Sequence, residues 1–442
     1  MIYLILLLQV ITCLVVSKIV KNKAISLSVL LCNVSLFMYS CFGIDRFDID
    51  TKYYGTYLTC MLTFNFCFIL GNCFCNFVHS KKTVHGVTYG CSIDYFFHKY
   101  NNYVKYVAYL YFAIRVIQLF YPEFFLKYLF QGPNFIYSNL LEALRESTDT
   151  TFGHILATLS TITLPFAYLY LQKMGTRRII IFLIFDLIAQ YLTGRGSIGR
   201  LAIIRNILIV CLVLYISANT KSSRRKIVLC SSIASILCVC LYVIMEYMRN
   251  GQSIASSNLN LIQIINYYFD GEFFYPKHYP LAEQLSKQNA YPPIVFWGWL
   301  LTLPVPKTIF NLSFVDSYTS ITYRVFSYYY WNHHWGYEGG YAGMLLSVVG
   351  DGILAYGSEL AFIIIIPYAF FIGFFLRFIT KIENSQLFFC YTLFYFFVSF
   401  RPGVQYGLSY VNTYVGIILF VLVFRFLSVN GRSVRFNIRR ER

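Results

Sequence analysis

The stretch MIYLILLLQVITCLVVSK, residues 1–18, carries no charged side chain before Lys18. A run of this kind is long enough to cross a bilayer as an α-helix, and similar runs of about 17 to 25 residues recur along the chain. The 442-residue chain is 58% hydrophobic and only 12% charged, about half the charge of an ordinary globular protein. No basic segment precedes the first run, so we expect a membrane helix here and not a cleaved signal peptide. The sequence therefore predicts an all-α integral membrane protein.

The apolar runs predict a polytopic bundle of about eleven transmembrane helices with one large external loop. The predicted spans are residues 1–18, 24–43, 54–78, 103–121, 152–172, 178–194, 200–218, 227–247, 353–376, 386–400 and 406–427. The chain then divides into eight helices in 1–247, a large loop in 248–340, and three helices with a basic tail in 341–442. The loop is rich in Tyr, Asn, Pro and Trp, which favours a folded segment over a disordered one.

Basic residues sort by side when the predicted loops alternate across the membrane. Most of the 36 Lys and Arg residues fall on one side, together with the tail, which places that side in the cytoplasm and the N-terminus outside. The net charge of +17 is therefore explained by membrane topology, and no nucleic acid is needed as a partner. The 13 Cys lie mostly in apolar runs without metal-ligand spacing, so we expect neither a metal nor another cofactor.

Three arginines in TGRGSIGRLAIIRN, residues 193–206, oppose this charge bias. Arg195, Arg200 and Arg205 lie at the predicted outer ends of the sixth and seventh spans. A guanidinium group is always charged and its planar fork matches a phosphate, and the neighbouring glycines allow close approach of a bulky anion. We predict a pyrophosphate-binding site here. The alternative is that these arginines reach lipid head groups or pair with carboxylates such as Asp186.

Two further arginines are candidates for the same site. Arg401 lies in the short predicted outer loop of FRPGVQYG, residues 400–407, and joins the site if the tenth span lies beside the sixth and seventh. Arg115 lies inside the fourth span, where an ionisable residue points to function. Its alternative role is a structural ion pair with Asp186.

A catalytic base is predicted near the end of the long loop. His333 and His334 lie between two tryptophans, and Glu338 follows them. Histidine accepts a proton near neutral pH, and aromatic rings suit the apolar faces of a sugar. The alternative is an interfacial aromatic loop in which the histidines are incidental.

The following glycines recur every seven residues, at Gly336, Gly343, Gly350 and Gly357. This spacing predicts one continuous helical stripe that begins near Gly340 and lets another helix pack closely. Asp351 lies within it, as a base or as a partner of a basic residue.

These features together resemble the Wzy family, the oligosaccharide repeat-unit polymerases of bacterial O-antigen and capsule assembly. The resemblance is carried by the dominant external loop, the TGRGS turn, the Pro304–Lys307 element after FWGWLLTL, and GGYAGMLLSVVGDGILAYG. It implies a GT-C-like membrane glycosyltransferase in the bacterial inner membrane, with a periplasmic N-terminus and loop and a cytoplasmic C-terminus. The implied substrate is an undecaprenyl-pyrophosphate-linked oligosaccharide, and the implied partners are a flippase and a chain-length regulator.

Two other classes fit parts of the sequence. An O-antigen ligase of similar architecture would use the same lipid donor and transfer the glycan to a lipopolysaccharide core. A repeat-unit flippase or other transporter would normally show internal repeats and broken helices in matching positions, which this sequence lacks.

Overall fold

The computed structural model describes about half of the chain, and the described part is helical without a strand. The described residues are 2–20, 22–81, 101–120, 220–233, 273–302, 326 and 346–382, with scattered positions between 156 and 186, between 392 and 408, and residue 416. The helices are α1 (Ile2–Val20), α2 (Lys23–Ser40), α3 (Gly43–Arg46), α4 (Lys52–Lys81), α7 (Asn101–Phe120), α15 (Tyr279–Lys287), α16 (Pro293–Thr302), α20 (Ser347–Leu360) and α21 (Phe362–Ile382), with the 3-10 helix η2 (Tyr275–His278).

Four stretches of the described chain are long and apolar enough to cross a membrane. They are Ile2–Val20, Ala24–Arg46, Lys52–Phe77 and Phe362–Thr380. The first three agree with predicted spans within a few residues, and α7 agrees in extent with the predicted fourth. These helices support the predicted class, a membrane protein built as a helical bundle.

The predicted ninth span, 353–376, is wrong in where it begins. The structure divides this part of the chain into α20 and α21, and the long apolar helix starts only at Phe362. The chain also kinks inside α20, where Gly357 adopts φ 80° and ψ 170°, a conformation that no helix contains and that glycine reaches without a steric penalty. A Cβ on Gly352 would collide with the carbonyl oxygen of Ala361, so the chain folds back tightly at this kink.

The predicted continuous glycine stripe is wrong for the same reason. It ends at Gly357, and α20 begins at Ser347, whose φ of 65° does not continue a helix from the preceding residues, so no helix runs unbroken from Gly340. Gly350 does allow close packing, because a Cβ there would lie 3.2 Å from the Tyr279 ring of α15. Gly336 and Gly343 lie outside the described residues.

The chain forms two compact units. The first comprises Met1–Lys81, Ser222–Phe378 and Cys390–Tyr410, and the second comprises Lys82–Lys221, Ile379–Phe389 and Val411–Arg442. The sequence predicted a different division, into eight helices, a large loop and three helices with boundaries at residues 247 and 340. That division stays a prediction.

Helices α1, α2 and α4 of the first unit pack against one another and are joined by buried amides. Asn33 of α2 and Asn65 of α4 exchange two side-chain hydrogen bonds of 2.9 Å, and Gln9 of α1 donates to the carbonyl oxygen of Asn33 at 2.5 Å. In a membrane such side chains must find partners within the protein, so these amides fix which helix faces contact one another.

Helices α4 and α21 cross at two glycines. A Cβ on Gly71 would collide with the carbonyl oxygen of Phe370, and a Cβ on Gly373 would collide with that of Phe68. Near the far ends of both helices, Arg377 Nε donates to Asn76 Oδ1 at 2.9 Å. Tyr53 at the start of α4 and Ser358 just before α21 both contact Glu283, so the two helices begin at the same end and run in parallel, as the predicted topology requires.

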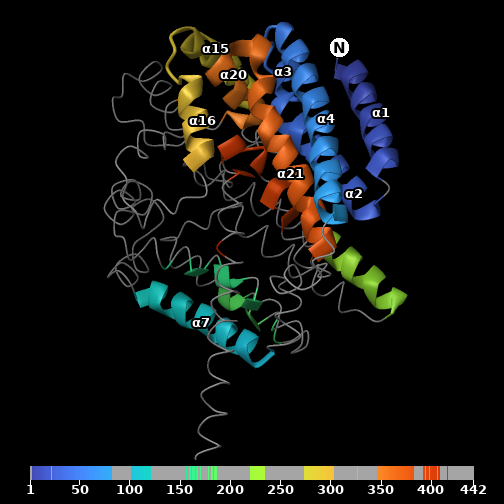
Figure 1. Ribbon diagram of the computed structural model, residues 1–442, viewed down its shortest axis with the longest axis vertical. Coiled ribbons are helices and arrows are strands. Elements are labelled where there is room, and N and C mark those ends of the chain that lie inside the picture. The colour runs from blue at the N-terminus through green and yellow to red at the C-terminus, as the bar shows by residue number, and fades with distance from the viewer. Residues whose placement is uncertain are drawn as a thin grey trace, which may run out of the picture. The chain divides into compact units, whose positions relative to one another are not determined.

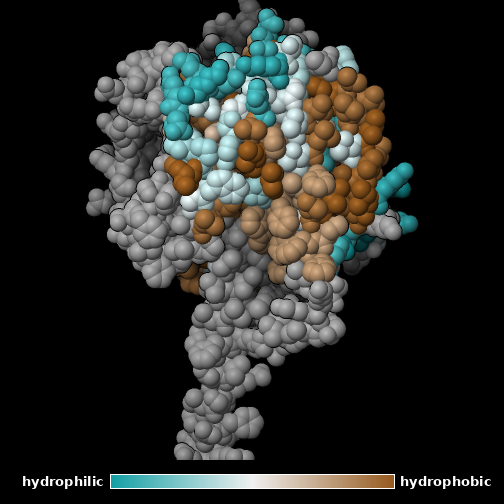
Figure 2. Space-filling model, turned by 45° about the horizontal axis from the view of Figure 1, so that its top comes forward, coloured by the Kyte–Doolittle hydropathy of each residue, from teal (hydrophilic) through white to brown (hydrophobic). Residues whose placement is uncertain are grey.

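The segments that were predicted to lie on the outer side of the membrane meet at one end of this unit (Figure 1). Helix η2 contacts α2, α3, α15 and α20, and Val348 N donates to the carbonyl oxygen of Phe400 at 3.2 Å. Figure 2, in which this end comes forward, shows hydrophilic residues gathered over it and hydrophobic residues over the flank of the bundle. We call this region the polar end of the first unit.

Candidate functional site

Arg401, one of the predicted arginines, lies at the polar end of the first unit. Its turn is closed by a 3.1 Å hydrogen bond from Gly403 N to the carbonyl oxygen of Ser399. Arg401 Nε donates to the hydroxyl of Tyr275 in η2 at 2.6 Å, and the Arg401 side chain is half-buried. Tyr275 itself is buried against Tyr39, with ring centroids 5.8 Å apart. The long loop therefore positions the guanidinium of Arg401.

Asp351 holds the same turn from the other side. The carboxylate is 1% exposed, and its Oδ2 accepts a 2.9 Å hydrogen bond from the backbone N–H of Val404. A Cβ on Gly403 would collide with this carboxylate, and Gly403 has φ 104°, so only glycine fits here. Asp351 thus acts as a backbone acceptor for the turn that carries Arg401, a role that the sequence analysis did not foresee.

Tyr291 completes the contacts around this turn. Its hydroxyl accepts a hydrogen bond of 3.3 Å from Gln405 Nε2, and its ring is buried. Burial, and then the negative charge of Asp351, raise the pKa of Tyr291. The hydroxyl therefore stays protonated and can serve as a hydrogen-bond group beside the buried carboxylate.

Helix α15 is fixed to the bundle by Tyr279. Its buried hydroxyl donates to the carbonyl oxygen of Ser40 at 3.0 Å and lies 3.2 Å from Ser347 Oγ. Ser40 Oγ in turn donates to Ser347 Oγ at 3.2 Å. One tyrosine therefore links the end of α2, the start of α15 and the start of α20.

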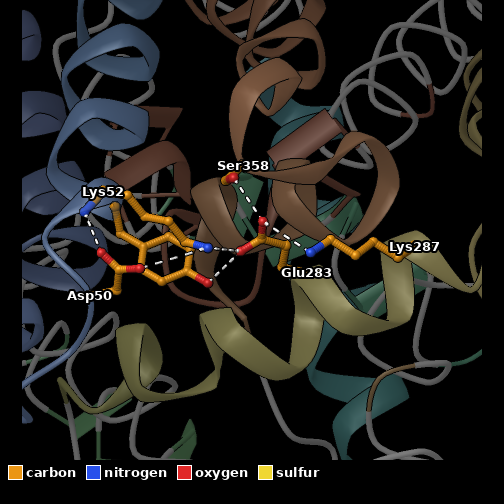
Figure 3. Close-up of polar contacts among 6 residues, drawn as sticks. Asp50, Lys52, Glu283, Lys287 and Ser358 are labelled. Atoms are coloured by element: carbon orange, nitrogen blue, oxygen red, sulfur yellow. Dashed lines mark hydrogen bonds and ion pairs between the residues drawn. The ribbon is translucent and has the colours of Figure 1, made fainter.

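Glu283 of α15 forms the densest group of charges that the structure describes (Figure 3). Its Oε2 lies 2.7 Å from Lys52 Nζ and accepts a hydrogen bond from the Tyr53 hydroxyl at 2.7 Å. Its Oε1 accepts from Ser358 Oγ at 3.2 Å and lies 4.0 Å from Lys287 Nζ. The side chain of Glu283 is only 14% exposed, whereas that of Lys287 is 77% exposed.

These contacts set the charge of Glu283. Burial raises its pKa, but hydrogen bonds from Lys52, Tyr53 and Ser358 stabilise the carboxylate and hold the pKa below its ordinary value. Glu283 is therefore ionised near neutral pH and joins α4, α15 and the residue after the Gly357 kink. This makes it a structural carboxylate and a poor proton acceptor.

Arg115 of α7 belongs to the second unit, where it pairs with Asp186. Arg115 Nε lies 3.2 Å from Asp186 Oδ1, and both side chains are buried. The Tyr111 hydroxyl joins them: it accepts from Arg115 Nε at 2.9 Å and donates to Asp186 Oδ1. The ion pair that the sequence offered as an alternative for Arg115 is present, and an anion-binding role for Arg115 stays a prediction.

The other predicted site residues lie outside the described part of the chain. They are Arg195, Arg200, Arg205, His333, His334 and Glu338. Their assignment to pyrophosphate binding and to proton transfer stays a prediction.

Tyr275 and Glu283 were not singled out from the sequence. Both lie in the long loop, in FFYPKHYPLAEQLSK, where the sequence analysis noted only the aromatic richness of the segment. Glu283 is the only carboxylate of α15, and amphipathic spacing of Tyr279, Ala282 and Leu285 gave a usable signal for a docked helix.

Comparison with known proteins finds nothing similar. No protein-family model, no curated protein and no solved structure matches this chain. The described helices by themselves support a helical membrane protein with a folded loop segment at the end of its bundle.

Proposed function

We propose that this chain is a membrane glycosyltransferase that polymerises oligosaccharide repeat units carried on undecaprenyl pyrophosphate. The observation that carries the proposal is Arg401, a permanent cation at the polar end, positioned by Tyr275 of the long loop. A cation fixed at the membrane surface suits a lipid-linked diphosphate, because charge-assisted hydrogen bonds to phosphate oxygens are strong and directional. The resemblance of the sequence to the Wzy family supports the same class.

The proposed reaction needs no nucleotide. A hydroxyl of the acceptor repeat unit attacks the anomeric carbon of the donor glycan, and the bond between that carbon and the pyrophosphate oxygen breaks. The proton passes to a base, proposed as His333, His334 or Glu338, and undecaprenyl pyrophosphate leaves with its electron pair. Arg401, with Arg195, Arg200 and Arg205, stabilises the negative charge that develops on the leaving diphosphate.

The wider arrangement follows from the same proposal. The four candidate spans belong to a GT-C-like bundle of about eleven helices in the bacterial inner membrane, with the polar end facing the periplasm. The N-terminus is then periplasmic and the basic tail cytoplasmic. A flippase supplies the lipid-linked repeat unit on that face, and a chain-length regulator acts on the growing product.

Purified protein in nanodiscs, supplied with a defined lipid-linked repeat unit, tests the proposal. We expect a ladder of polymers from the unaltered chain, loss of long products in Arg401→Ala, Arg195→Ala and Arg200→Ala, and a ladder from Arg225→Ala. Arg225 is a matched control because it is an exposed arginine in the 221–233 helix. Equal ladders from all four variants would overturn the phosphate-binding role.

The rival ligase is distinguished in cells. Loss of a polymerase leaves single repeat units on the lipopolysaccharide core, whereas loss of a ligase leaves the core bare. His333→Ala and His334→Ala test the catalytic base. The variant that removes the proton-accepting histidine should abolish turnover, and the other variant should not. Unchanged activity in both would move the role to Glu338 or Asp351.

A further inference from the structure

Helix α16 has no charged side chain on any face. Its sequence, PIVFWGWLLT, lies within the loop that was predicted to be external. A helix that is hydrophobic all round is stable inside a protein core or inside a membrane, and not as a solvated surface helix. The surroundings of its two faces decide between these environments.

One face of α16 is buried in the first unit. Phe296 is 0% exposed and Trp299 is 7% exposed, and the helix contacts α20. The Trp297 indole Nε1 donates to the hydroxyl of Tyr356 at 2.5 Å. This bond gives the indole N–H of Trp297 a partner, so the ring can leave water without a lost hydrogen bond.

The opposite face of α16 carries a stripe of large apolar side chains. Ile294 is 69% exposed, Trp297 is 37% exposed and Leu301 is 80% exposed. Their spacing of three and four residues places them on one side of the helix. We call these three residues the α16 stripe.

The position of α16 connects this stripe to the membrane. In Figure 1, α16 starts near α15 at the polar end and points down along the bundle. It lies at the same height in the view as the first turns of α4. Ten residues of helix extend about 15 Å, which is half of a hydrocarbon core of about 30 Å. The large apolar side chains of α1 and α4 are exposed in the same way, as expected for helices that face lipid.

We propose that α16 is an intramembrane half-helix whose stripe contacts the acyl chains of the bilayer. The long loop then enters the outer half of the membrane through Pro293 and is not wholly aqueous. Its backbone is satisfied as a helix, and its inner face is covered by α20, which are the conditions for a loop segment at membrane depth. This inference does not depend on the proposed enzymatic activity.

Tryptophan fluorescence tests the proposal in nanodiscs of phosphatidylcholine with brominated or unmodified acyl chains. A chain that keeps Trp297 as its sole tryptophan carries Trp299→Phe, Trp331→Phe and Trp335→Phe. Bromine on the acyl chains should remove most of the Trp297 emission, while aqueous iodide should leave it unchanged. Iodide quenching without bromolipid quenching would overturn the proposal.

Two matched chains without the native tryptophans calibrate the result. Gln284→Trp, on an exposed position of α15, should respond to iodide and not to bromolipid. Leu14→Trp, on the exposed face of α1, should respond to bromolipid. If Leu14→Trp is quenched by bromolipid and Trp297 is quenched by neither agent, a protein surface covers the stripe and the proposal is wrong.

The unaltered chain provides a second measurement that needs no substitution. A phospholipid with a diazirine in its acyl chain should label Pro293–Thr302 on illumination, and it should not label Tyr279–Lys287. Mass spectrometry of the peptides reads the sites. Labelling of α1 without labelling of α16 would contradict the proposal, whether or not the protein polymerises glycans.

Discussion

Asp351 accepts a hydrogen bond from the backbone N–H of Val404 at 2.9 Å, so a buried carboxylate of α20 holds the turn that carries Arg401. On the other side of this turn, Arg401 Nε donates to the Tyr275 hydroxyl. Residues of the long loop, the kinked helix α20 and the turn after Phe400 are thereby joined in one connected set. The position of Arg401 depends on both contacts.

Removing the Asp351 carboxylate should loosen this turn. We expect Asp351→Ala to lower the free energy of unfolding by about 1–3 kcal/mol, because a buried N–H loses its acceptor. Asp351→Asn keeps an acceptor oxygen and should cost less. Thermal unfolding in detergent measures both, with Glu359→Ala as the control because Glu359 is an exposed carboxylate of the same helix. Equal melting of Asp351→Ala and the unaltered chain would rule out this role.

The contacts of Glu283 should make the packing of α15 against the bundle weaker in acid. Its pKa is lowered in the folded protein from an ordinary value of 4.5, because its hydrogen bonds outweigh burial. The ionised group therefore stabilises the fold fully above pH 4.5, and this contribution is lost as the pH falls through the lowered pKa. Glu283→Gln should lower stability at pH 7 and flatten the fall in acid.

Melting curves between neutral and acidic pH measure this difference. Glu359→Gln removes an exposed carboxylate from α20 and should leave the pH profile unchanged. Parallel profiles for Glu283→Gln and the unaltered chain would show that the ion pair with Lys52 contributes nothing. The side chains of Lys52 and Lys287 are 45% and 77% exposed, so solvent screening keeps their individual contributions small.

Hydropathy predicted α1, α2 and α4 within a few residues because their composition alone requires a membrane. It misplaced the start of α21, since averaging over 353–376 hides a single glycine whose φ of 80° kinks a helix. The partners of Arg401 could not be predicted, because Tyr275 lies 126 positions away along the chain. Contacts between residues so far apart in the sequence depend on how the helices pack, and local hydropathy contains no information on that packing.

The crossing of α4 and α21 should not tolerate a methyl group. Gly71→Ala and Gly373→Ala each place a Cβ against a backbone carbonyl oxygen of the other helix, so the helices must separate. We expect a loss of about 1–3 kcal/mol for each, as for other overpacked sites. Gly55→Ala is the matched control in α4, because its Cβ would meet nothing within 4 Å. A loss in Gly55→Ala as large as in Gly71→Ala would mean that helix crossing is not the cause.

The pair of Arg115 and Asp186 predicts strong coupling in the second unit. Arg115→Met leaves the fully buried carboxylate of Asp186 without its cation, which should cost about 3–5 kcal/mol. Asp186→Leu alone should cost a similar amount, because the buried guanidinium then loses its anion. The double variant Arg115→Met with Asp186→Leu should recover most of the loss, since neither charge remains. Unfolding of the three variants in detergent, with Arg225→Ala as the exposed control, measures the coupling. Additive losses in the double variant would show that the two side chains act independently, and would leave Arg115 available for the anion-binding role.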